Sequence, residues 1–301
     1  MRDFTGIILA AGESTRMKSN LPKALHDICG RPMIEYVLDV LEQVHLKRTA
    51  IVLSKKQEAL RSYLKPKKGI KVVFQMRPQG TADALKSGRS FFAKSKENVL
   101  VMCVDTPLVR KETLEALMAK HKESHASCTI LTAYVENPSG LGRIVRDEFS
   151  KACRIIEEND ASFSQKQIKE INSGIYCFKV QELLQSLSDI KMNEKKKEFY
   201  LTDIVQILYG RGKRIETCDC IDANEITGIN SQNELSKASE SMRFRILEEF
   251  MREGVTLISP QTTFIHYGSV IGKDTVIHPF TFIESAVRVG ENCSIGPFCR
   301  L

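Results

Sequence analysis

Two cationic side chains follow a turn of small residues near the N-terminus. The stretch "IILAAGESTRMKSNLPKALH" covers residues 7–26, where an apolar run leads into Gly12, then Arg16 and, after Pro22, Lys23. A strand that ends in small residues lets backbone N–H groups approach an anion, and Gly12 suits the turn itself. An arginine can hold phosphate oxygens with two N–H groups, and a lysine adds a point charge. The spacing matches neither the P-loop nor the dinucleotide-binding glycine pattern, so a phosphate loop and a plain turn with two surface cations fit this stretch equally well.

The first half of the chain predicts elements that would place this turn at one edge of a sheet. Apolar runs predict strands at 4–10, 49–54, 70–75, 98–105 and 127–135, and helical periodicity predicts helices at 33–44, 57–64, 81–93 and 111–121. Alternating strands and helices indicate a mostly parallel, doubly wound α/β sheet, in which ligands bind at the carboxyl ends of the strands. The opening turn, Gln75 and Asp105 all fall at predicted strand ends.

The pattern changes in the second half. "GRIVRD", "ACRIIEE" and "NSGIYCF" predict additional strands that form a sheet-rich insertion, and a helix is expected at 198–210. A long helix at 233–254, ended by Gly254, is expected to connect this part to the C-terminal segment. The predicted division is a catalytic part at 1–230, a connecting helix at 231–254 and a repeat region at 255–301.

The C-terminal segment repeats with a period of six. The repeated aliphatic positions are Ile265, Ile271, Ile277, Ile283, Val289, Ile295 and Leu301, and small or β-branched residues follow four positions later. Hexapeptide repeats build a parallel β-helix. A homotrimer could form through this β-helix, although the sequence does not determine the oligomeric state. The repeat reaches Leu301 without a polar capping segment, so we expect a fragment of a longer chain or a short form that a partner subunit caps.

Composition narrows the class of protein. The formal charge of +7 is spread along 301 residues without a basic arm, so nucleic acid is not the expected partner. The apolar runs are too short for a signal peptide or a membrane span, so a membrane partner is not expected. The nine cysteines are scattered and include no Cys-x-x-Cys pair. We therefore expect buried free thiols and a cytoplasmic location. His121 and His125 lie four residues apart, but with no third ligand in view a surface helix is the simpler interpretation.

An ordered set of short motifs indicates a particular family of enzymes. In sequence order, these are "LAAGESTRMKSNLPKALH", "QMRPQGTADAL", "CVDTPL", "GLGRI", "IIEENDA", "INSGIY", "FYLTDI" and "GIN". Their order and spacing resemble the sugar nucleotidyltransferases, most closely the bacterial bifunctional N-acetylglucosamine-1-phosphate uridylyltransferase/glucosamine-1-phosphate acetyltransferase family, over residues 4–301. The resemblance implies a Rossmann-like mixed sheet of the nucleotide-diphospho-sugar transferase type, a connecting helix and a left-handed β-helix. In that family the β-helix continues further and carries the acetyltransferase site, so acetyl transfer is not expected from these 301 residues.

The resemblance also implies roles for individual residues. Arg16 and Lys23 would hold the triphosphate, and Asp105 with Asn230 would bind Mg²⁺. The residues that the resemblance implies for nucleotide binding are Leu9, Ala10, Ala11, Gly12, Gln75, Gly80 and Thr81. Those that it implies for sugar binding are Gly142, Glu157, Asn172, Tyr200 and Thr202. Taken singly, each residue is better explained without a metal: Asp105 as a helix N-cap before "TPLVRKETL", and Asn230 as an Asx turn. Within the ordered set of motifs, the metal site is favoured.

The implied reaction is attack of N-acetylglucosamine 1-phosphate on the α-phosphate of UTP, which gives UDP-N-acetylglucosamine for cell-envelope precursors and pyrophosphate. The nucleophile is already ionised, so positioning and charge neutralisation should supply the catalysis, and Mg²⁺ takes one or two protein oxygens beside phosphates. The chain departs from the family pattern at Glu13, Ser14, Cys103, Val104 and Asn159. The change at Cys103 and Val104 keeps another sugar, such as glucose 1-phosphate, as an alternative. A non-catalytic assembly subunit is a further alternative, against which the joint presence of Arg16, Lys23, Asp105 and Asn230 argues.

Overall fold

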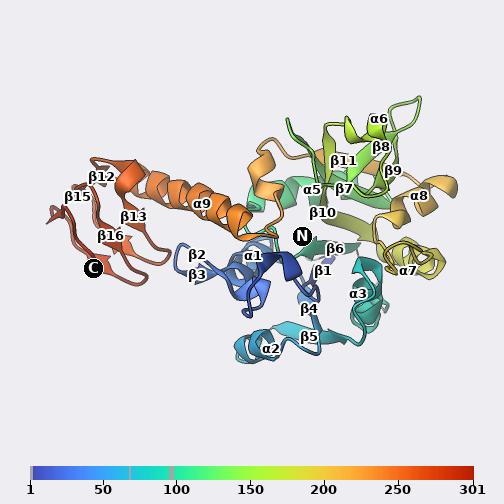
Figure 1. The fold of residues 1–301 in the computed structure, drawn as a ribbon, viewed down its shortest axis with the longest axis horizontal. Helices are drawn as coiled ribbons and strands as arrows, with labels where there is room; N and C mark the ends of the chain where they lie inside the picture. The colour runs from blue at the N-terminus through green and yellow to red at the C-terminus, as the bar shows by residue number, and fades with distance from the viewer. Residues whose placement is uncertain (1–2, 68, 95–97) are drawn as a thin grey trace.

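The computed structural model describes residues 3–67, 69–94 and 98–301. An α/β part forms one end of the molecule, and helix α9 (Gln232–Arg252) runs from it to a stack of short strands at the other end (Figure 1). This order of parts agrees with the sequence-based prediction.

A mixed sheet lies at the centre of the α/β part. Its main path follows the order β11-β7-β10-β6-β1-β4-β5. The strands on this path are β1 (Phe4–Leu9), β4 (Arg48–Ser54), β5 (Ile70–Gln75), β6 (Asn98–Cys103), β7 (Cys128–Tyr134), β10 (Glu170–Lys179) and β11 (Ile215–Asp219). Strand β1 pairs in parallel with β4 and β6, and β4 pairs in parallel with β5, so these four strands end at one edge. Strand β10 lies antiparallel between β6 and β7.

Helices cover both faces of this sheet, which explains the continuous apolar runs. Every residue of β1 is buried, as expected of a strand packed on both sides. The core on one face is formed with α1 (Met33–Gln43), α2 (Glu58–Leu64) and α5 (Lys111–Glu123). The core on the other face is formed with α3 (Thr81–Ser87), α4 (Arg89–Phe92), α7 (Val180–Asp189) and α8 (Asp203–Gly210).

Several predicted boundaries are corrected by the structure. The helix expected at 81–93 is interrupted at Gly88 into α3 and α4. Helix α8 begins at Asp203 rather than at 198, because Phe199 exchanges backbone hydrogen bonds with Gln79 and Ala82 and the chain there stays extended. Of the strands expected to form an insertion, β10 instead lies inside the main sheet, while β8 (Arg143–Arg146) and β9 (Ala152–Ile156) pair at its side.

Short elements complete the α/β part. They are the hairpin β2 (Asp27–Ile28) and β3 (Arg31–Pro32), the helix α6 (Phe163–Lys166), and the 3₁₀ turns η1 (Thr15–Met17), η2 (Lys23–Leu25) and η3 (Ala223–Ile226). The 3₁₀ turn η4 (Pro260–Thr262) lies after α9.

The six-residue repeat builds a parallel β-helix, as predicted. Its strands have two residues each: β12 (Thr256–Leu257), β13 (Phe264–Ile265), β14 (Val270–Ile271), β15 (Val276–Ile277), β16 (Phe282–Ile283), β17 (Arg288–Val289) and β18 (Ser294–Ile295). Val276 of β15 pairs with Ser294 of β18, three repeats later, so each coil has three sides. Ile265, Ile277 and Ile283 are buried inside, which accounts for the strict aliphatic spacing.

The β-helix packs on the α/β part as well as on α9. One apolar cluster joins Met33 of α1, Phe250 of α9 and Ile283 of β16. Gly30 in the β2–β3 turn has φ +77°, and a Cβ there would lie 2.5 Å from His266 Nδ1, so the close approach requires glycine. Tyr267 N–H donates to the Cys29 carbonyl at 2.9 Å.

Other sequence-based expectations have definite outcomes. His121 is not on a surface: it is buried, and its ring nitrogens contact Thr129 Oγ1 at 2.9 Å and Asn98 Oδ1 at 3.3 Å. Burial lowers the pKa of His121 to about 4, with Lys179 adding to the effect. His125 lies beyond the end of α5.

All nine cysteines are free, but only four are buried. No helix in the described ranges is both long and apolar enough to span a membrane.

Candidate active site

A loop with unused backbone donors follows β1. In the described part of the chain, the backbone N–H groups of residues 11–16 donate to no protein acceptor. Part of this loop, with residues 19–23 and the start of α2, lines a pocket of about 450 Å³. Arg16, on η1, is exposed and makes no hydrogen bond or ion pair with the described residues. Unpaired N–H groups beside a free guanidinium form an anion-binding concavity, so the loop is suited to hold phosphates.

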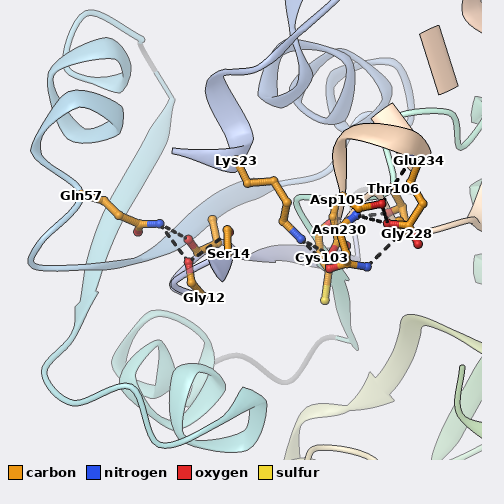
Figure 2. Close-up of polar contacts among 12 residues, drawn as sticks. Gly12, Ser14, Lys23, Gln57, Cys103, Asp105, Thr106, Gly228, Asn230 and Glu234 are labelled. Carbon is orange, nitrogen blue, oxygen red and sulfur yellow. Dashed lines mark hydrogen bonds and ion pairs between the residues drawn. The ribbon is translucent and has the colours of Figure 1, made fainter. Parts of the chain in front are cut away.

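The loop is held from outside by a helix. Gln57, just before α2, donates through its side-chain amide to the carbonyls of Ala10 at 2.9 Å and Gly12 at 3.4 Å (Figure 2). The expectation that Gly12 itself makes the turn is corrected, because the positive φ angles occur at Ser14 (53°) and Lys18 (48°). A Cβ on Gly12 would meet no described atom within 4 Å, so the glycine leaves the pocket open.

Lys23 bridges two residues that lie far from it in sequence. Its ammonium donates to Asp105 Oδ2 at 2.7 Å and to Asn230 Oδ1 at 2.9 Å (Figure 2). The side chains of Lys23 and Asp105 are 11% and 20% exposed, so the ion pair is largely removed from water. The structure therefore brings together three of the predicted phosphate and metal residues.

Local structure fixes the two oxygen donors. The carbonyl of Asp105 accepts from Ile229 N–H at 2.9 Å, which ties the end of β6 to the segment that carries Asn230. Asn230 N–H donates to Glu234 Oε2 at 2.7 Å. Helix α5 begins only at Lys111 and Ser231 caps α9, so neither Asp105 nor Asn230 is a helix cap.

The two oxygens suit a hard divalent cation. They converge on one cationic group, the Lys23 ammonium, and a carboxylate with an amide oxygen is a donor set that Mg²⁺ accepts. Within the described residues, no three His, Cys, Asp or Glu side chains gather as an all-protein metal site would require. Bound phosphates and water would therefore have to supply the other ligands.

The residues predicted to bind the nucleotide differ in how many hydrogen-bonding groups they have available for a ligand. Leu9 is a core residue, and both backbone groups of Ala10 are already used, by Val52 and Gln57. Gln75 is buried, and its amide nitrogen donates to Asp83 Oδ2 at 2.7 Å and to the Gly80 carbonyl at 3.2 Å. Its carbonyl oxygen is the part left for a ligand, so Gln75 could accept a hydrogen bond from a base but not also donate one.

Gly80 and Thr81 join the nucleotide side to the predicted sugar side. Gly80 has φ +97°, and a Cβ there would lie 2.6 Å from the Phe199 carbonyl oxygen. The Thr81 hydroxyl accepts from Leu201 N–H at 3.0 Å. These contacts place Tyr200 and Thr202 beside the N-terminus of α3.

The predicted sugar residues gather around one carboxylate. Thr202 donates to Glu157 Oε1 at 3.0 Å, and Asn172 N–H donates to the Gly142 carbonyl at 2.9 Å. Burial raises the pKa of Glu157, and burial with the nearby Asp160 carboxylate raises the pKa of Tyr200 to about 12. A desolvated carboxylate in such a pocket can accept hydrogen bonds from hydroxyl groups of a ligand.

Cys103 lies between the two groups of residues. Desolvation raises the pKa of its thiol to about 12, with a further contribution from Asp105, while Lys23 opposes the shift and Glu157 adds to it. A Cβ added to Gly174 would lie 3.8 Å from the sulfur of Cys103. The thiol is therefore protonated at neutral pH, and it lies close enough to Asp105, Lys23 and Glu157 for their charges to act on it.

Comparisons with known proteins identify the family of this chain. Residues 6–169, more than half of the chain, match the MobA-like NTP transferase domain. The chain belongs to the MobA-like NTP transferase family. Residues 268–301 match the bacterial transferase hexapeptide (six repeats).

Individual relatives resemble this NTP transferase over almost its whole length. It is 40% identical over 296 residues to "Bifunctional protein GlmU" of Carboxydothermus hydrogenoformans, and 38% identical over 294 residues to the protein of that name from Clostridioides difficile. Each alignment covers 98% of this chain but only 66% and 63% of the respective relative. The chain thus spans slightly less than two-thirds of the length of these relatives.

The departures Glu13, Val104 and Asn159 are accommodated in this NTP transferase. Glu13 forms an ion pair with Lys56 at 3.1 Å, which offsets its negative charge beside the pocket. Val104 is buried in the core, and Asn159 is exposed in a turn after β9.

Some contributing residues carry no obvious signal in the sequence. Gln57 and Asp83 act on the site across the fold, and nothing near them in sequence indicates it. Glu234 could have been found, because Ser231 and Glu234 have the spacing of a helix capping box. Ser231 Oγ in fact accepts from Glu234 N–H at 3.3 Å.

Ser14→Gly is expected to stabilise the phosphate loop. A left-handed residue other than glycine costs about 1–2 kcal/mol, while glycine loses roughly 0.5–1 kcal/mol more conformational freedom on folding. The free energy of unfolding, measured with urea, should therefore rise slightly, by about 0.5 kcal/mol. Ser14→Ala removes the same hydroxyl but keeps the left-handed strain, so it should be less stable than Ser14→Gly. Equal stability of the two variants would contradict this account.

Glu157→Gln is expected to stabilise the fold near pH 8. Since burial raises the pKa of Glu157, its ionised form opposes folding above that pKa, and the penalty disappears as pH falls through it. The neutral amide keeps an acceptor for Thr202 and avoids the buried charge, so unfolding free energy should rise by about 1 kcal/mol at pH 8 and by less at pH 5. Thermal unfolding at the two pH values measures this difference.

The neighbouring Glu158 provides a control of opposite sign. Its hydrogen bond with Arg143, an ion pair of 2.6 Å, lowers the pKa of Glu158, so its stabilisation is present at neutral pH and lost as pH falls through that lowered pKa. Glu158→Gln should therefore destabilise the fold at neutral pH. A stabilising effect of both substitutions, or of neither, would contradict the assignment of Glu157 as a desolvated carboxylate without a cationic partner among the described residues.

Proposed function

We propose that this chain transfers a uridylyl group from UTP to N-acetylglucosamine 1-phosphate, and so forms UDP-N-acetylglucosamine, a precursor for cell-envelope polymers, and pyrophosphate. The observation that carries the proposal is that Lys23, beside a loop whose N–H groups at 11–16 have no acceptor in the described chain, contacts both Asp105 and Asn230. Asp105 and Glu157 both act electrostatically on the thiol of Cys103, which supports a sugar site near this group. Phosphates, metal and sugar would meet at Cys103, where the new bond must form.

The chain's own residues would act by positioning and by charge. A phosphate oxygen of the sugar phosphate attacks the α-phosphorus of UTP, and the bond from that phosphorus to the bridging oxygen breaks, so that pyrophosphate leaves. The nucleophile is already ionised, which explains why the described site needs no base with a pKa near neutrality. Arg16, Lys23 and the loop N–H groups would neutralise the developing charge on the leaving phosphates.

A divalent cation, proposed to be Mg²⁺, would be held by Asp105 and Asn230. When bound, it would supply positive charge to the α-phosphate and its neighbours. Asp105 would contribute the only formal negative charge of this pair, and Asn230 would be oriented by its backbone contact with Glu234.

Substrate choice would depend on two places. Gln75 is proposed to accept from the base, since Asp83 and Gly80 occupy its amide nitrogen. Glu157, Tyr200, Thr202 and Asn172 would hold the sugar. The departure from the family pattern at Cys103 keeps glucose 1-phosphate as the second candidate.

One assay tests the proposal. Pyrophosphate release with Mg²⁺ would be measured for UTP, CTP, ATP and GTP, each with N-acetylglucosamine 1-phosphate and with glucose 1-phosphate. The expected result is the highest kcat/KM for UTP with N-acetylglucosamine 1-phosphate. A preference for glucose 1-phosphate would replace the sugar assignment, and no release with any pair would overturn the catalytic assignment.

The organisation of the chain forms part of the proposal. We divide it into a transferase part at 1–230, a connecting helix at 231–254 and a β-helix at 255–301. Helix α9, which precedes the short strands of the β-helix in the chain, supports this division. Exposed rings on the β-helix, such as Phe280 and Phe298 stacked at 5.1 Å, support its use in a homotrimer.

A further inference from the structure

The ammonium of Lys23 occupies oxygens of the two side chains that are proposed to hold a divalent cation. It is 2.7 Å from Asp105 Oδ2 and 2.9 Å from Asn230 Oδ1, the two oxygens that could hold the metal. A metal ion bound to both oxygens at about 2.1 Å could not share this position with the ammonium. Lys23 and the metal must therefore compete for the same pair of oxygens.

The Lys23 ammonium could also bind an anion in the neighbouring pocket. Besides contacting Asp105, it lines the pocket formed by the loop after β1, where the N–H groups of residues 11–16 are free. A lysine side chain has four rotatable carbon–carbon bonds and three donors, so the ammonium can turn from the two oxygens toward an anion in the pocket. A bound polyphosphate would offer it negative charge there.

We propose that Lys23 acts as an internal competitor of the metal. In the free chain its ammonium neutralises Asp105 and occupies Asn230, and the divalent cation binds well only after a polyphosphate has drawn the lysine away. Metal and nucleotide then enter cooperatively, because each favours the arrangement that the other requires. The inference rests on the metal site of the proposed function, but not on the identity of the base or the sugar.

Direct metal binding tests this inference without any substrate. Mn²⁺ is titrated into the full chain in the absence of nucleotide, and free Mn²⁺ is followed by electron paramagnetic resonance. Lys23→Met keeps the side chain's length and removes its charge, so the Kd for Mn²⁺ should fall by about ten- to a hundredfold, the range set by loss of a charge-assisted hydrogen bond. Lys23→Gln provides a second variant if the methionine form does not fold, as judged by circular dichroism.

Two controls make the result specific. Lys56 lines the same pocket, is 80% exposed and forms an ion pair with Glu13, so Lys56→Met removes an equal charge and frees only the Glu13 carboxylate. Because the two oxygens of Asp105 and Asn230 stay occupied by Lys23, the Kd for Mn²⁺ should fall far less than in Lys23→Met. Adding Asp105→Asn to Lys23→Met should abolish the gain. Unchanged Mn²⁺ affinity in the Lys23 variants, an equal gain in Lys56→Met, or a gain that survives Asp105→Asn would each overturn the inference. Failure of the proposed function would instead show as absent pyrophosphate release by the unmodified chain.

Discussion

Asp105→Asn should lower kcat at saturating UTP and sugar phosphate by about 100- to 1000-fold, the typical loss when one group that stabilises developing charge is removed. The substitution keeps the side chain's size and an acceptor for Lys23, but it removes the one negative charge offered to the metal. The fold should remain, because the backbone carbonyl that ties Asp105 to Ile229 is unaffected. Steady-state pyrophosphate release, with Mg²⁺ varied from limiting to saturating, measures the effect.

A matched substitution away from the site serves as control. Asp3 also forms an ion pair with a lysine, Lys122, at 2.8 Å, but both side chains are about half exposed. Asp3→Asn should therefore leave kcat within twofold of the unmodified chain. Normal turnover of the Asp105→Asn variant would remove the metal role from this residue, and an equal loss in both variants would indicate a general effect of charge.

Arg16→Ala is expected to lower kcat/KM for UTP by about a hundredfold or more, and Arg16→Lys by roughly ten- to a hundredfold. The guanidinium is exposed and has no partner in the described chain, so its charge is available to a ligand. A lysine keeps the charge but loses the two-pronged geometry, which explains the intermediate effect. Stability should hardly change, since no internal contact of the side chain is lost.

Lys18 gives the control for Arg16. It lies two residues further along the same loop, is exposed and has the same charge, but it follows η1, and its backbone N–H already donates to the Thr15 carbonyl. Lys18→Ala should keep kcat/KM for UTP within about threefold, as expected when only the distant field of a screened surface charge changes. If Arg16→Ala and Lys18→Ala behave alike, the loop attracts UTP only by its net charge, and the specific phosphate contact is wrong.

Much of the fold could be predicted because its determinants are local or periodic. The run of β1 is apolar on both faces since helices cover both, and the repeat from Ile265 onward follows from one inward side chain per side of each coil. The same reasoning failed for β10, whose "NSGIYCF" segment looks like any strand. Its insertion between β6 and β7 depends on pairing with strands distant in sequence.

The residues of the candidate site could likewise be predicted from sequence, but the contacts between them could not. Sequence motifs selected Lys23, Asp105 and Asn230, and the ends of predicted strands placed Gln75 and Asp105 at one edge of the sheet. No local pattern predicts that Lys23 Nζ lies within hydrogen-bonding distance of Asp105 and Asn230, which are 82 and 207 residues away. It follows from the register of β1 against β6 and from the tie between Asp105 and Ile229.

The sequence by itself determined the succession of strands and helices, the six-residue repeat and the residue types available for phosphate and metal chemistry. Backbone hydrogen bonding and burial of one face impose those periods wherever the chain folds, so they can be read locally. Only the tertiary structure decided that Ser14 rather than Gly12 has the left-handed backbone and that Asp83 occupies the amide nitrogen of Gln75. It also decided that Lys23 contacts both Asp105 and Asn230. Those contacts join side chains from separate elements, and their distances depend on how all of the intervening elements pack together.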